Sequence, residues 1–320
     1  MGGWRPAVRA RGDARGLDAR RPRARVLGQE DLAEARALCA RDPVTSVLAA
    51  ARLEVAAVAG FAAAGGQAWG FPATGPLVAV CWSGANLVPV LSPDLVGRDA
   101  DDAVAAFAAT ARAQGRRSSS IVGDRTAALA LWDLLAPRWP PAREVRADQP
   151  SLAIARDPDV EPDALVRRST LGEVDAVLPA CVRMFAEEVG YAPAASPGSA
   201  YALRVRSLVA EGRSFVRMEA PDSAPGTGTG PGPGPGPFVA FKAELGAVAG
   251  GVAQVQGVWV DPLRRGRGLA APGMAAVVVA TRREVAPVVS LYVNAFNAPA
   301  LATYRRVGFE QVGTFTTVLF

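Results

Sequence analysis

One loop in this chain has the composition of an anion-binding site. The stretch Ala253 to Val260 has the apolar character of a strand, Asp261-Pro262 ends it, and an alanine-rich segment typical of a helix follows the loop. The first N–H groups of a helix have no internal partners and carry the positive end of the macrodipole. The two glycines of the loop let the backbone curve around a ligand, and its two arginines add positive charge. The loop consists of Arg265, Gly266, Arg267, Gly268, Leu269 and Ala270.

A second motif follows about 30 residues later, after a strand-like segment at Val288 to Val293. Together the two segments resemble the GCN5-related N-acetyltransferase (GNAT) superfamily, over residues 252–313 in detail. The acyl-CoA loop pattern of that superfamily, Arg/Gln-x-x-Gly-x-Gly/Ala, is matched by Arg265, Gly268 and Ala270. Its later pattern, Asn-x-x-Ala-x-x-x-Tyr-x-x-x-Gly-Phe, is matched by Asn297, Ala300, Tyr304, Gly308 and Phe309.

The resemblance implies transfer of an acetyl group from acetyl-CoA, as co-substrate, to an amine acceptor by direct attack in a ternary complex. The acceptor is a small molecule or a protein amino group. The resemblance carries the pantetheine contacts onto the backbone of Val258 and Val260, and the pyrophosphate contacts onto residues 265–270. It carries a further cofactor hydrogen bond onto Asn297, and it implies no metal.

Tyr304 is the candidate general acid, because a phenol can protonate the departing thiolate of CoA. Glu244 lies on the strand before the loop strand, where proteins of the resembled superfamily often carry a carboxylate, and the resemblance makes it the candidate base, directly or through a water molecule. Glu187 and Glu188 are alternative contacts for a cationic acceptor, and for each glutamate a solvated surface position stays open. Cys181 lies in an apolar helical stretch and is interpreted as a packing residue.

Composition excludes several other classes of protein. The chain has no histidine, which removes histidine-based catalysis and His-ligated metals, and its three cysteines have no paired spacing. No uncharged apolar run is long enough to span a membrane, and no secretory signal is present, so a cytoplasmic protein is expected. The net charge of +5 comes from the first 27 residues, which hold eight arginines and two aspartates, so nucleic-acid binding is not expected. No oligomeric state is indicated.

The order of predicted elements occurs twice: strand, two helices, three strands, helix, strand, helix and strand. We therefore predict a layered α/β (α+β) fold of two tandem GNAT-like domains, each with a mixed, mostly antiparallel sheet flanked by helices. The predicted divisions are a disordered basic tail at 1–24, a degenerate copy at 25–158 and a catalytic copy at 159–320, with a Gly/Pro-rich loop insertion at 222–237.

The first copy offers no counterpart of the anion loop. Its residues 92–102 contain one glycine and one arginine, followed by Asp99, Asp101 and Asp102, which would repel a pyrophosphate. A decayed first copy beside an active second one resembles certain actinobacterial acetyltransferases, the mycothiol-synthase arrangement included. An alternative function stays open: a regulator that binds acyl-CoA without turnover.

Overall fold

A computed structural model describes residues 22–220 and 236–320, and the predicted tail at 1–24 and insertion at 222–237 lie almost wholly outside them. The first half of the described chain contains β1 Arg25–Val26, η1 Gln29–Asp31, α2 Leu32–Cys39, α3 Pro43–Ala64, β2 Gln67–Phe71, β3 Ala79–Ser83, β4 Asn86–Leu91, α4 Gly97–Gln114, β5 Ser120–Asp124, α5 Arg125–Leu135 and β6 Glu144–Ile154. The second half contains β7 Arg167–Arg168, η2 Leu171–Glu173, α6 Val174–Val189, α7 Ala200–Ala210, β8 Ser214–Glu219, β9 Phe238–Ala249, β10 Val252–Val260, η3 Pro262–Arg264, α8 Ala270–Glu284, β11 Val288–Tyr292, α9 Ala298–Val307 and β12 Glu310–Leu319. The repeated element order and the α/β fold class predicted from the sequence are confirmed.

Local sequence explains where several helices begin. The side chain of Asp42 accepts a hydrogen bond from Thr45 N at 3.2 Å, and Pro43 occupies the first position of α3, where its missing N–H costs nothing. Asp124 caps α5 in the same way, accepting from Thr126 N at 2.9 Å. Both caps place a carboxylate at the positive end of a helix.

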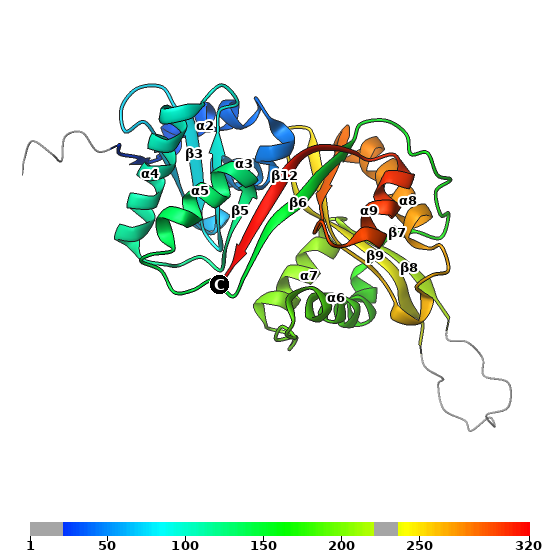
Figure 1. Cartoon of the computed structure of the whole chain (residues 1–320). Helices are drawn as coiled ribbons and strands as arrows, with labels where there is room; N and C mark the ends of the chain where they lie inside the picture. The colour runs from blue at the N-terminus through cyan, green and yellow to red at the C-terminus, as the bar shows by residue number, and fades with distance from the viewer. Residues whose placement is uncertain (1–21, 221–235) are drawn as a thin grey trace, which may run out of the picture.

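The strands of the described residues form one sheet of twelve, in the order β1-β2-β3-β4-β5-β12-β6-β11-β10-β9-β8-β7. The two predicted sheets are thus joined, and the two halves exchange their last strands. β6, from the first half, pairs with β11 of the second, and β12 pairs with β5 of the first. β6 and β12 also pair with each other and run side by side across the middle of the molecule (Figure 1). The predicted boundary at 158/159 falls between β6 and β7 in sequence, but the sheet continues across it.

Helices cover both faces of this sheet. In the second half, α8 and α9 pack on one face and α6 and α7 on the other. In the first half, α4 and α5 cover one face and α2 and α3 the other. By length and composition α3 could cross a membrane, but it contributes Val47, Ala50 and Leu53 to a buried cluster that reaches Ala249 and Val252 of the second half. The two halves therefore share a core as well as a sheet.

Candidate functional site

β10 separates from its neighbour β11 partway along its length. The two strands are parallel and pair only from Val252 to Gln254, whereas β10 continues to Val260. The edge of β10 that faces β11 is therefore outside a ladder over its second half, which includes Val258. An extended ligand that contains amide groups can pair with such an edge.

A bulge lies in β10 shortly beyond the point where the strands separate. Gln256 pairs with Glu244 of β9 and Trp259 pairs with Lys242, so Gly257 and Val258 together lie opposite a single residue. Gly257 has a φ of +61°, which favours glycine. The bulge redirects the backbone of β10 just before the residues that the sequence assigns to the pantetheine arm.

The predicted anion loop connects β10 to α8. Asp261 Oδ1 accepts from Leu263 N at 2.9 Å and holds the short turn η3 at the end of the strand. Gly266 and Gly268 have φ values of +73° and +79°, and a Cβ on either would meet nothing within 4 Å. α8 then begins at Ala270 without a side-chain cap. The loop thus turns an uncapped helix N-terminus toward open space, as a phosphate site requires.

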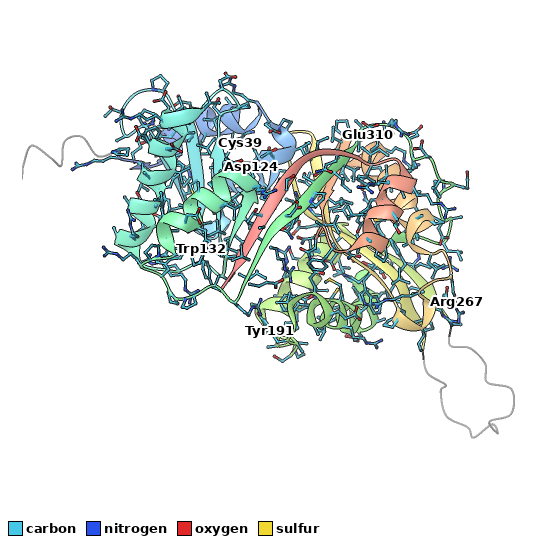
Figure 2. The ribbon with its side chains drawn as sticks, viewed as in Figure 1. Cys39, Asp124, Trp132, Tyr191, Arg267 and Glu310 are labelled. Atoms are coloured by element: carbon cyan, nitrogen blue, oxygen red, sulfur yellow. The ribbon has the colours of Figure 1, made fainter. Side chains whose placement is uncertain are left out.

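The two arginines of the loop differ in their surroundings. Arg265 is half-exposed, its Nε donates to Val260 O at 3.1 Å, and its Nη2 lies 2.5 Å from Glu187 Oε2. Arg267 is exposed at the outer end of this half, away from β6 and β12 (Figure 2). Arg265 therefore bridges the end of β10 to α6.

Both glutamates at the end of α6 have partners in the structure. Glu187 binds Arg265 and also accepts from Trp259 Nε1 at 3.3 Å. Glu188 Oε1 lies 2.7 Å from Nη1 of Arg146, which comes from the exchanged strand β6. Both carboxylates are held by arginines or an indole in this structure.

Tyr304 lies on α9 with 7% of its surface exposed, and its ring meets Phe309 edge-on at 6.0 Å. Among residues 22–220 and 236–320, none forms a hydrogen bond with the phenolic oxygen. Burial, and to a smaller extent the charge of Glu188, raises the pKa of Tyr304, so the phenol keeps its proton at neutral pH. Asn297 is the N-cap of the same helix, and its Oδ1 accepts from Ala300 N at 3.2 Å.

Glu244 belongs to a buried cluster that was not predicted from the sequence. Its Oε1 lies 2.8 Å from Lys242 Nζ and 3.1 Å from Cys181 Sγ, and the residue is 7% exposed. Lys242, the only lysine of the chain, is fully buried, and its Nζ also donates to Gly257 O at 3.0 Å. A side chain on Gly257 would come within 3.0 Å of Glu244 Oε2. The cluster therefore lies directly against the bulge of β10.

The charges of this cluster follow from its contacts. Burial acts to lower the pKa of Lys242, but Glu244 and Cys181 outweigh it and raise the pKa above its ordinary value. Burial raises the pKa of Cys181 to about 12, which leaves a protonated and poorly nucleophilic thiol. Two sequence signals could have pointed here: a single lysine on an apolar strand, and a glycine inside the next strand.

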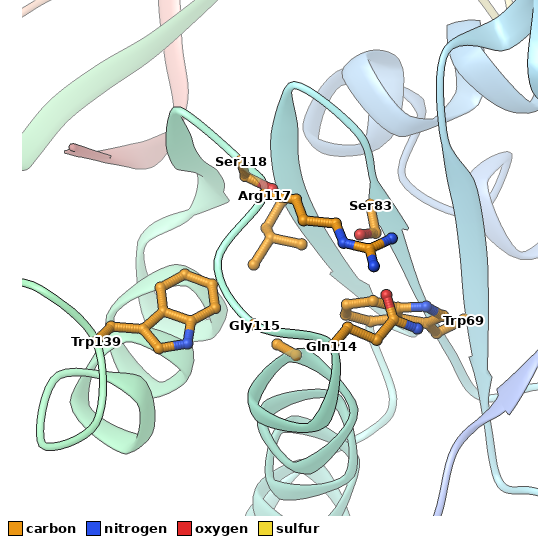
Figure 3. Close-up of a pocket in the computed structure, with 9 residues that line it drawn as sticks. Trp69, Ser83, Gln114, Gly115, Arg117, Ser118 and Trp139 are labelled. Atoms are coloured by element: carbon orange, nitrogen blue, oxygen red, sulfur yellow. The ribbon is translucent and has the colours of Figure 1, made fainter.

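The first half has a different structure at the corresponding position. After β4, Arg41 donates to Ser92 Oγ at 2.5 Å and pairs with Asp94, which ties the loop down. Elsewhere in this half, at the C-terminal end of α4, a small cavity of about 10 Å³ is lined by residues such as Trp69, Gln114 and Trp139 and has room for a water-sized group (Figure 3).

Two family models match parts of the chain. Residues 233–309 match the model of the acetyltransferase (GNAT) family, and residues 66–177 match a domain of unknown function (DUF4081). No curated protein matches the chain.

Several solved structures have a similar fold over nearly the whole chain. A GCN5-related N-acetyltransferase from Sphaerobacter thermophilus is 17% identical, with a TM-score of 0.55 and coverage of 94% of this chain and 96% of that one. A GNAT-family acetyltransferase from Colwellia psychrerythraea is 13% identical, with a TM-score of 0.52 and coverage of 93% and 99%. A tandem GNAT protein from the clavulanic acid biosynthesis pathway is 15% identical, with a TM-score of 0.52 and coverage of 92% and 98%.

Proposed function

The chain carries an acetyltransferase (GNAT) domain at residues 233–309 within a tandem GNAT fold, and from this premise we propose that it moves an acetyl group from acetyl-CoA to an amine acceptor. One observation carries the proposal: an uncapped helix N-terminus, preceded by two glycines of positive φ, directly follows a strand that has separated from its neighbour. The pyrophosphate would bind residues 265–270, the pantetheine arm would pair with Val258 and Val260, and the thioester would lie beside the bulge at Gly257.

In the proposed reaction, the neutral amine attacks the thioester carbonyl carbon. A C–N bond forms, the C–S bond breaks, and the phenol of Tyr304 gives its proton to the leaving thiolate. The amine loses its own proton, for which Glu244 is the proposed acceptor, because its Oε2 lies beside the bulge. Orientation of the two substrates supplies much of the rate.

The direct test is thiol release from acetyl-CoA across a panel of small amines and peptides. We expect release that depends on the acceptor and a product that contains an amide. Tight binding of acetyl-CoA without acceptor-dependent release would instead identify a regulator that binds acyl-CoA.

Replacing Gly268 by valine should weaken acetyl-CoA binding by on the order of ten- to a hundredfold. A β-branched residue is strained at a φ of +79°, and its side chain would project into the open space in front of α8. Isothermal titration of the full chain measures the effect. Gly97→Val is the matched control, since Gly97 has a φ of +60° with nothing within 4 Å, but begins α4 in the first half. Equal losses in both variants would contradict the assignment of the loop.

We also expect each chain to bind one acetyl-CoA. The first half has its corresponding loop held by Arg41 and places Asp99, Asp101 and Asp102 in the first two turns of α4, where they repel an anion. Calorimetry on the full chain should give a stoichiometry of one. A stoichiometry of two would show that the first half retains a site.

A further inference from the structure

The buried Lys242 has contacts that connect it to the backbone at the proposed thioester site. Its Nζ donates to Gly257 O at 3.0 Å and lies 2.8 Å from Glu244 Oε1, which also accepts from Cys181 Sγ at 3.1 Å. A fully buried ammonium is costly unless it has a counter-charge and hydrogen-bond acceptors, and here Glu244 supplies the charge and Gly257 O a main-chain acceptor. One of these acceptors is a main-chain carbonyl in the middle of a bulge, where the strand ladder does not fix its direction.

Holding this carbonyl also fixes the next N–H group. The peptide bond between Gly257 and Val258 is planar and trans, so its C=O and N–H point in opposite directions. With Gly257 O drawn toward Lys242, the Val258 N–H points away from Lys242. A glycine at a φ of +61° has no side chain to restrict the rotation of this peptide, so the lysine contact supplies the restraint.

We propose that Lys242 is a positioning residue for acyl transfer: through Gly257 O it aims the Val258 N–H at the thioester carbonyl of the bound acetyl-CoA. A fixed N–H donor stabilises the negative charge that develops on that oxygen during attack. The inference rests on the proposed function and adds to it a role for a residue that would not touch the substrate.

The test compares two variants that share the same loss of the Glu244 carboxylate. Glu244→Gln keeps Lys242 against Gly257 O, whereas the double variant Lys242→Met/Glu244→Gln removes that contact and leaves no charge in this cluster. The probe is acetyl-CoA labelled with ¹³C at the thioester carbonyl, bound to the full chain without acceptor. Infrared difference spectra report the C=O stretch, calorimetry gives the affinity, and single-turnover kinetics give the rate.

In Glu244→Gln the C=O stretch should lie below that of free acetyl-CoA, as in the natural chain. In the double variant the C=O stretch should return toward the value of free acetyl-CoA. Relative to Glu244→Gln, the acetyl-CoA affinity should stay within about twofold, and the single-turnover rate should fall by on the order of ten- to a hundredfold. A residue that only supported the fold would not move the C=O stretch at unchanged affinity. An unchanged stretch and rate in the double variant would overturn the inference.

Two further outcomes keep this inference separate from the proposed function. If the natural chain fails to bind acetyl-CoA or to transfer the acetyl group, the proposed function fails. If it does both, a structure of the natural chain with acetyl-CoA tests the positioning role even when the variants do not fold. A thioester oxygen beyond hydrogen-bond distance of Val258 N would then refute the inference alone.

Discussion

Tyr304→Phe should lower turnover by about 10²–10⁴-fold while leaving acetyl-CoA affinity nearly unchanged. The substitution removes only the hydroxyl, which has no hydrogen-bond partner among the described residues, and the ring still packs against Phe309. The raised pKa of Tyr304 keeps the proton available up to alkaline pH, so the loss should be seen throughout the neutral range. Single-turnover rates at saturating substrate measure the chemical step directly.

Tyr292→Phe is the matched control for this prediction. Tyr292 is a second phenol whose pKa burial raises, but it ends β11 and stacks on Phe315 at 5.0 Å. Loss of the Tyr292 hydroxyl should change the single-turnover rate little. An unchanged rate in Tyr304→Phe would reduce Tyr304 to a packing residue and leave only the acetyl-CoA site of the proposal standing.

The second large effect concerns stability. Lys242→Met alone should lower the free energy of unfolding by about 3–5 kcal/mol, because it leaves the Glu244 carboxylate buried without its cation. Adding Glu244→Gln should recover most of that loss, since the double variant leaves no charge in the cluster of Lys242, Glu244 and Cys181. Urea unfolding followed by circular dichroism measures both, with similar denaturant slopes expected for the three proteins.

Cys181→Ala provides the comparison for this stability prediction. It removes a neighbour of Glu244 without removing a charge, so its cost should stay near that of a small cavity, about 1 kcal/mol. If Lys242→Met cost no more than Cys181→Ala, the lysine and the glutamate would not act as an ion pair in the folded chain.

The fold was predictable where local signals and tertiary packing agree. Asp42-Pro43 marks the start of α3 because a carboxylate cap and a proline both suit a first helical turn. In β6 and β12 only the C-terminal ends, near residues 152–154 and 315–319, have the apolar pattern that predicts a strand from the sequence. Their other parts, Glu144–Gln149 and Glu310–Thr314, are rich in polar residues and lack a strand pattern. These parts form strands because β6 and β12 pair with each other, a contact between residues about 170 apart.

The candidate site likewise has one part that could be predicted from the sequence and another that could not. The anion loop depends on consecutive residues, so its glycines, its arginines and the helix after it could be identified together in the sequence. The cluster of Lys242, Glu244 and Cys181 depends on which face of β9 meets α6, and a sequence does not specify that directly. The partners of Glu187 and Glu188 were also missed, because Arg265 and Arg146 reach them from distant segments.

Because the two halves exchange β6 and β12, neither half has a complete sheet without the other. A gene cut between codons 158 and 159 would not separate two folding units, because each product would lack the strand that completes its own sheet. Loss of the last eleven residues would open a gap in the middle of the sheet between β5 and β6 and expose two unpaired edges. The second half therefore needs the first for a strand, whatever the first half itself binds.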